Sequence, residues 1–212
     1  SEEDPSIEQR PATASEPTLI AVVGVAHGRD PDEVRLEMRG SKFPPKDLQQ
    51  SLPQQLAVLA AAIEASGDIA LPSDATGVFV GIEPDCEVAR YGTRWRMARI
   101  AAEGGHSDSW LATARDGVVP ALTAAAVVGT MPNIPANRVS SQLDLHGPAF
   151  TLAHGVESGT TALRLAVRGL RSRELDAAIV GAADFSDETV HAAAAHTVIT
   201  NFRYFPLFRY MF

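Results

Sequence analysis

The chain has 212 residues and a net charge of −8, from 18 basic and 26 acidic residues. It is long enough to bury a real core, in one large domain or two small ones. The acidic balance argues against nucleic acid or an anionic membrane as a partner, because neither offers an acidic surface a long-range attraction. No apolar run reaches the ~18 residues of a membrane span, no secretory signal is visible, and the single cysteine, Cys86, excludes an internal disulfide. We therefore expect a cytoplasmic protein.

Three segments differ in composition. Residues 1–17 are polar, acidic and proline-bearing, which is typical of a disordered linker. The ordered domain is expected to span residues 18–198. It begins with the apolar, β-branched run TLIAVVGV at residues 18–25, which predicts a strand buried on both faces. Residues 199–212 form an atypical tail that is dense in Phe, Tyr and Arg.

A helix and a strand are predicted next. Ser51, Pro53 and Gln54 form a capping-box pattern, which predicts that Ser51 caps a helix beginning at Pro53. Apolar residues then recur at helical spacing up to a stop near Gly67. The run ATGVFVGIE, residues 75–83, predicts a second buried strand.

The second half of the chain alternates helices and strands. Residues 84–116 give no firm placement, and residues 118–147 read as one or two helices broken at the prolines. The later elements are expected as strand 149–153, helix 158–171, strand 176–185 and helix 186–198. Buried strands that alternate with helices predict a layered α/β fold.

The turn AHGVESG, residues 153–159, joins a predicted strand to a predicted helix. Several enzyme folds hold a nucleophile at such an elbow, and the hydrolase form is G-x-S-x-G. Here Ser158 stands one position late, after Val156 and Glu157. A shift of one residue at a helix start turns the side chain by about 100°. The turn therefore has the setting of an elbow without an obvious nucleophile.

Several segments together resemble the N-terminal half of a β-ketoacyl synthase of the thiolase superfamily. The matching features are Asn137-Arg138, Gly147-Pro148 before the elbow strand, the closing VGAAD, and Pro53-Gln54-Gln55 at a helix start. The resemblance covers roughly residues 18–195. It implies a thiolase-like fold, namely the N-terminal half of a duplicated α-β-α-β-α architecture.

The resemblance places Val156 at the position of the family's catalytic cysteine. Valine has no lone pair with which to attack a thioester. In lacking this cysteine, the chain resembles the chain-length factors. The segments PPKDLQQSLPQQL and GIEPDCEVARYGTRWR are similar in sequence to the synthase-like domains of polyunsaturated fatty acid synthases and iterative polyketide systems. The resemblance implies a non-catalytic subunit that pairs with an active ketosynthase, or with itself, through the elbow strand and shapes the acyl tunnel. It implies no cofactor of its own, and the acyl-phosphopantetheine of an acyl carrier protein as the bound group.

Two other functions stay open. Ser158 with His154 could serve an acyltransferase or thioester hydrolase with a remodelled elbow. A structural role is favoured over a catalytic one for both residues. Ser158 would satisfy exposed backbone amides at the helix start, and His154 would be a hydrogen-bonded histidine of the turn. Glu157 gains from the helix dipole, but His154 with Glu157 is a weak metal signal. The chain could also be a fragment that acts as an interaction scaffold.

A row of arginines follows the elbow. Arg164, Arg168 and Arg171 recur at i, i+4 and i+7, and they could form a basic stripe for an acidic acyl carrier protein. A solvated face with local salt bridges is the favoured alternative. Leu163, Val167 and Leu170 are expected to form the apolar face of the same helix. No glycine-rich nucleotide motif is present.

Overall fold

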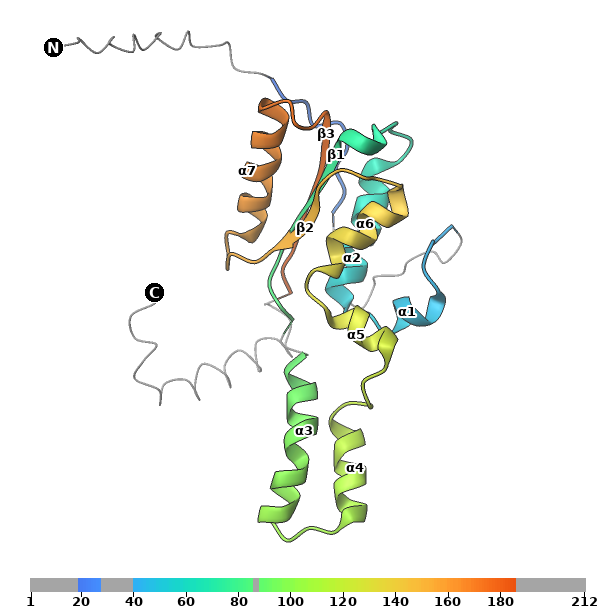
Figure 1. Cartoon of the computed structure of the whole chain (residues 1–212), viewed down its shortest axis with the longest axis vertical. Helices are drawn as coiled ribbons and strands as arrows, with labels where there is room; N and C mark the ends of the chain where they lie inside the picture. The colour runs from blue at the N-terminus through green and yellow to red at the C-terminus, as the bar shows by residue number, and fades with distance from the viewer. Residues whose placement is uncertain (1–18, 28–39, 86–87, 186–212) are drawn as a thin grey trace, which may run out of the picture.

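The computed structural model describes residues 19–27, 40–85 and 88–185 (Figure 1). Three predictions concern residues outside these ranges, namely the linker at 1–17, the helix at 186–198 and the tail at 199–212, and Cys86 also lies outside them.

The described chain folds around a parallel three-stranded sheet with the strand order β2-β1-β3. Its strands are β1 (Thr76–Ile82), β2 (Ala149–Leu152) and β3 (Ala177–Ala183). Helices α2 (Pro53–Ser66) and α6 (Ile134–Leu143) cover one face, and α7 (Ser158–Arg171) covers the other (Figure 1). Two short helices, α1 (Pro45–Gln49) and α5 (Ala124–Thr130), pack together beside them, and a 3-10 turn, η2 (Ser73–Ala75), precedes β1. The predicted layered α/β class is confirmed.

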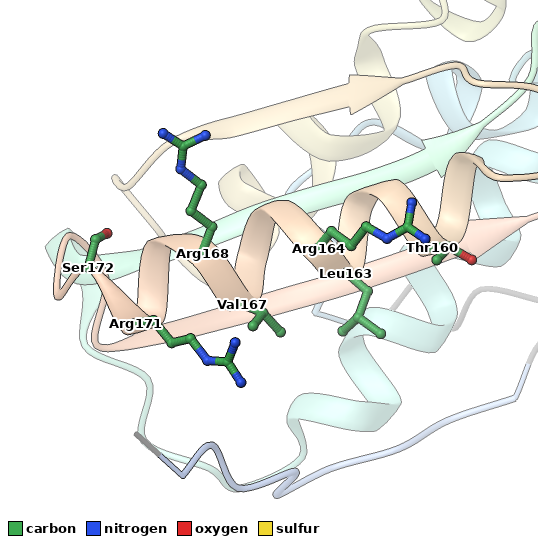
Figure 2. A pocket seen from close by; sticks show the side chains of 7 residues that line it. All are labelled: Thr160, Leu163, Arg164, Val167, Arg168, Arg171 and Ser172. Carbon is green, nitrogen blue, oxygen red and sulfur yellow. The ribbon is translucent and has the colours of Figure 1, made fainter. Parts of the chain in front are cut away.

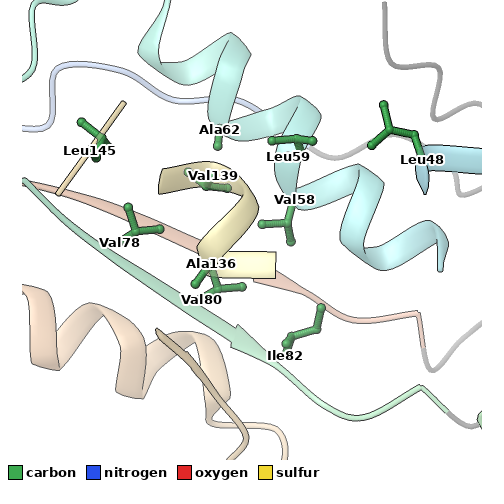
Figure 3. Close-up of a cluster of buried hydrophobic side chains, with 10 residues drawn as sticks. All are labelled: Leu48, Val58, Leu59, Ala62, Val78, Val80, Ile82, Ala136, Val139 and Leu145. Atoms are coloured by element: carbon green, nitrogen blue, oxygen red, sulfur yellow. The ribbon is translucent and has the colours of Figure 1, made fainter. Parts of the chain in front are cut away.

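The central strand β1 is buried along its whole length and divides the core in two. Because successive side chains of a strand point to opposite faces, Val78, Val80 and Ile82 face one layer while Phe79 faces the other. The first group packs with α2 and α6 in the larger cluster (Figure 3). Phe79 packs with Ala162 and other residues on the α7 side. The register places Val78 beside Ala149 in β2 and Ile179 in β3.

The predicted bounds of α2 are confirmed, but its predicted cap is wrong. Pro53 is the first residue and Gly67 ends the helix. The N-cap is Leu52, which makes no side-chain cap. The Ser51 hydroxyl instead donates to the carbonyl of Asp47 and accepts from the buried guanidinium of Arg138, both at 2.6 Å. Burial lowers the pKa of Arg138, while the nearby Asp47 carboxylate acts in the opposite direction.

The predicted strand at residues 18–25 is wrong for its described part. Residues 19–25 form no strand, and Leu19, Val22 and Val25 are 93%, 80% and 68% exposed. An apolar, β-branched run indicates side chains that favour burial, but a strand also needs a neighbour for its backbone groups. In the described chain the sheet ends at β3, so this run has no ladder partner.

The segment that gave no firm placement forms a helical hairpin that we call the arm. It consists of α3 (Val88–Glu103) and α4 (Asp108–Val118), which extend away from the three layers (Figure 1). The two helices pack on each other, and Arg94 lies 2.7 Å from Asp116. No helix among the described residues has the length and apolar character needed to cross a membrane.

Candidate functional site at the strand-to-helix elbow

The elbow joins the strand β2 to the helix α7, as the sequence predicted, and it lies at the carboxyl end of the sheet. Its position depends on Gly81 of β1, where an added Cβ would lie 2.3 Å from the carbonyl carbon and oxygen of Ser158. Any side chain at this position would push the start of α7 off the sheet. The close contact of β1 with α7 therefore requires glycine.

Ser158 is buried, with 5% exposure, and it holds the turn together. Its hydroxyl accepts a hydrogen bond from the backbone N–H of His154 at 2.7 Å. The same hydroxyl lies 2.8 Å from a Glu83 carboxylate oxygen and 2.8 Å from the carbonyl of Gly155, and it can donate its one proton to either. Ser158 therefore satisfies an exposed amide, although that amide belongs to the turn and not to the helix.

His154 is hydrogen-bonded to the first turn of α7. Its ring Nδ1 lies 2.9 Å from the hydroxyl of Thr161, one turn further along α7. A general base must be within hydrogen-bond reach of the proton that it removes. The ring is engaged with Thr161, so the geometry favours the hydrogen-bonded turn histidine over the remodelled elbow.

Val156 stands at the tip of the turn and is fully exposed, at 100%. The preceding Gly155 has φ = 55°, a left-handed conformation that suits glycine and turns the chain sharply. The side chain at the tip of the elbow is thus both fully exposed and aliphatic. It offers no atom that could form a covalent acyl intermediate.

Glu157 forms an exposed ion pair with Arg164. Its carboxylate lies 3.5 Å from Arg164, and both side chains are more than half exposed. Exposed pairs of this kind contribute little to stability. Among the described residues, no group of three His, Cys, Asp or Glu side chains is placed to hold a metal ion.

The outer face of α7 carries a shallow pocket of about 640 Å³ (Figure 2). It is lined by Thr160, Leu163, Arg164, Val167, Arg168, Arg171 and Ser172. The predicted apolar face of this helix is wrong for Leu163, which is 52% exposed. Small residues, Ala162, Ala166 and Gly169, face the sheet instead, since they let α7 lie close to β1 and β3.

The predicted basic stripe is divided. Figure 2 shows Arg171 extending on the same side of α7 as Leu163 and Val167, while Arg168 extends in another direction. Arg164 is drawn toward Glu157 by the ion pair at 3.5 Å. The pocket therefore combines two apolar side chains with a basic border.

Glu83 is the elbow residue that the sequence interpretation missed. It follows β1 directly, and its carboxylate meets the Ser158 hydroxyl. The carboxyl ends of parallel strands lie at one edge of a sheet, so a residue after β1 lies near the turn after β2. That rule was the available signal, but it needed the strand order, which a single sequence does not give.

Comparisons with known proteins identify the family of this scaffold. Residues 23–201 match the model of the β-ketoacyl synthase N-terminal domain. The highly reducing polyketide synthase easB of Emericella nidulans is 34% identical over 142 residues, which are 65% of this chain and 5% of that protein. A polyunsaturated fatty acid synthase subunit of Thraustochytrium sp. is 27% identical over 176 residues, 78% of this chain and 8% of that protein. The chain thus spans less than a tenth of the length of these relatives.

Solved structures show the same fold at low identity. The PfaC keto synthase–chain length factor matches with a TM-score of 0.60 and 22% identity, over 68% of this chain and 17% of the other. The ishigamide ketosynthase/chain length factor matches with a TM-score of 0.54 and 20% identity, over 76% of this chain and 42% of the other. These likenesses confirm the expected thiolase-like α/β fold.

Proposed function

Because the chain belongs to the β-ketoacyl synthase family through its N-terminal domain, we propose that it is a non-catalytic, ketosynthase-like subunit of the chain-length-factor type. It would pair with an active ketosynthase in fatty acid or polyketide biosynthesis and help to shape the acyl tunnel. Val156 carries this proposal. The strand, the sharp turn and the helix that present a nucleophile are all in place, and the residue at the tip is an exposed valine.

Pairing through β2 agrees with the shape of the sheet. β2 hydrogen-bonds β1 along one edge and leaves its other edge without a strand in the described chain. Phe150 of β2 is 40% exposed and meets Phe79 edge-on, with ring centroids 5.0 Å apart. A second strand on this edge would satisfy open backbone groups and cover an aromatic side chain. Both structural relatives are named as a ketosynthase together with a chain length factor.

The bound group of the complex would be the acyl-phosphopantetheine of an acyl carrier protein, and the chain itself would need no cofactor. The border of the α7 pocket supports a carrier contact, because Arg164, Arg168 and Arg171 offer positive charge to an acidic partner. Arg164 is partly compensated by Glu157, so Arg168 and Arg171 would supply most of this attraction.

Covalent labelling tests the proposal. The Cys86→Ser variant, which removes the one thiol, is incubated with an acyl thioester or a cerulenin-type epoxide and analysed by mass spectrometry. We expect no adduct at residues 153–159, because the exposed Val156 has no nucleophilic atom and the Ser158 hydroxyl is buried. An adduct at any of these residues would exclude a non-catalytic elbow.

The matched control is Val156→Cys in the same Cys86→Ser background. A thiol at the start of α7 is favoured as the thiolate by the helix dipole, so we expect alkylation at position 156. If this thiol reacts and valine does not, the elbow is accessible and the missing atom accounts for the inactivity. If neither protein is labelled, the turn is not open to acyl groups, which contradicts the exposed Val156.

A further inference from the structure

The arm has too little buried surface to be expected to hold its shape alone. Neither α3 nor α4 makes an extensive contact with another described element. Among the arm residues whose side chains are described, only Met97 and Ala101 are buried hydrophobic residues, while Trp95 is 78% exposed and Ile100 is 42% exposed. Short helices depend on packing for most of their stability. The outer face of α3 therefore needs a partner surface.

The charge of the arm indicates the kind of partner. Residues 88–118 contain five arginines and three carboxylates, in a chain whose net charge is −8. Trp95, Arg96 and Arg99 of α3 are all exposed, and Arg99 lies 3.6 Å from Glu103 in an exposed ion pair. Tryptophan and arginine are enriched in interface hot spots, and the charge selects an acidic surface.

An acidic surface lies at the opposite end of the same molecule. Asp74, Asp144, Glu174 and Asp176 are exposed where the three strands begin, and we call these residues the acidic edge. The segments that lead into the three strands are joined by backbone hydrogen bonds from His146 to Ser73 and from Asp176 to Ala75.

The His146 ring lies 2.9 Å from Asp74, and two cations offset part of the charge of the acidic edge. Lys42 lies 3.7 Å from Asp144, and Arg173 adjoins Glu174. The exposed side chain of Ile69, in the loop before η2, adds an apolar contact for an aromatic partner.

The arm leaves the sheet at its carboxyl end, because α3 follows β1, and the acidic edge lies at the amino end (Figure 1). We propose that two copies of the chain associate side by side and antiparallel, so that the arm of each copy lies on the acidic edge of the other. This arrangement has twofold symmetry and closes on itself, with the same two surfaces used twice. It uses neither β2 nor α7, so it stands independently of the function proposed above.

Charge reversal at each end gives a test by sedimentation velocity of the full chain over a concentration series. One variant carries Arg96→Glu and Arg99→Glu, and the other carries Asp74→Lys and Asp176→Lys. Each variant alone sets like charges against each other, so we expect its dimer dissociation constant to rise at least about tenfold. In a mixture of the two, every arm meets an edge of opposite charge, and we expect the dimer to return.

The mixture separates electrostatic pairing from misfolding. Circular dichroism of each variant checks its fold, and Arg164→Glu with Arg168→Glu on α7 is the control that should leave the dimer unchanged. Raising the salt concentration should weaken the unaltered dimer, since exposed charges are screened. A monomeric unaltered chain, a dimer that ignores both reversals, or a mixture that stays monomeric would each overturn the antiparallel dimer.

Discussion

Ser158 lies buried at the start of α7, where its hydroxyl joins the His154 amide to the Glu83 carboxylate. Replacing it with alanine would leave that amide without its acceptor. We expect Ser158→Ala to lower the free energy of unfolding by about 1 kcal/mol, the usual net contribution of one hydrogen bond. Any thioester turnover would be unchanged, because the Ser158 hydroxyl is buried in the turn, where it holds the His154 amide and is closed to an acyl group. Urea unfolding measures the first effect, and a thiol-release assay measures the second.

Thr160→Ala is the matched control for this substitution. Thr160 lies in the same first turn of α7 but is exposed. Removing its hydroxyl therefore leaves no buried group without a partner, and the free energy of unfolding should change little. Equal destabilisation by the two substitutions would mean that the loss comes from the helix start in general. A fall in turnover with Ser158→Ala alone would support the remodelled-elbow enzyme instead.

Among the elements, the contact of β1 with α7 gives the sharpest prediction. A Cβ at Gly81 would lie 2.3 Å from backbone atoms of Ser158, and backbone cannot move aside as a flexible side chain can. We expect Gly81→Ala to cost about 1–3 kcal/mol, the range for overpacking a core. Thermal unfolding followed by circular dichroism measures the loss.

Gly181 in β3 provides the comparison. A Cβ there would meet its nearest neighbour, Val58 Cγ1, at 3.7 Å, which is an ordinary contact. Gly181→Ala should therefore leave stability nearly unchanged. A similar loss at both positions would show that the close approach of α7 to Gly81 is not what limits the fold.

The elements that the sequence predicted well are those whose signal is local. Helix 158–171 matches the observed α7, and β1 lies within the predicted strand at 75–83. The run at 18–25 has an equally clear pattern, yet its described part forms no strand. Strand formation depends on a neighbour, which is a property of the sheet and not of the run. The arm gave no signal for a related reason, since most of its side chains are exposed on both helices.

The sequence was sufficient to find the key residue of the site, but it did not reveal the hydrogen bonds that hold the site together. Val156 could be found because its neighbours on both sides match a family pattern. The partners of Ser158 and His154 could not, because Glu83 and Thr161 reach them through the packing of α7 against β1. Leu163 was misplaced because an apolar residue at helical spacing can lie on either apolar side of a helix.

For the whole molecule, the arm and the layered body should unfold separately. The chain has two tryptophans, Trp95 and Trp110, and both lie in the arm. Tryptophan fluorescence therefore reports the arm, while far-ultraviolet circular dichroism also reports the body. In the Arg96→Glu, Arg99→Glu variant, we expect the fluorescence transition in urea to come first, because the arm has few buried contacts.

Coincident transitions by the two probes would contradict this independence, because they are the mark of one cooperative unit. His106 provides an internal check, since its ring stacks on Trp110 at 3.9 Å between centroids. His106→Ala should alter the fluorescence of the folded arm and leave the circular dichroism transition of the body in place.

The exposure of Val156 also bears on which residues this position can accept. The side chain at the tip of the elbow touches nothing in the described structure, so a change of residue there disturbs no packing. The turn keeps its shape through Gly155, Ser158 and Gly81, none of which depends on the tip. The residue at position 156 can therefore change the reactivity of the elbow without changing the stability of the fold. Over evolution, a nucleophile could be lost or regained here by a single amino-acid substitution that leaves the stability of the protein unchanged.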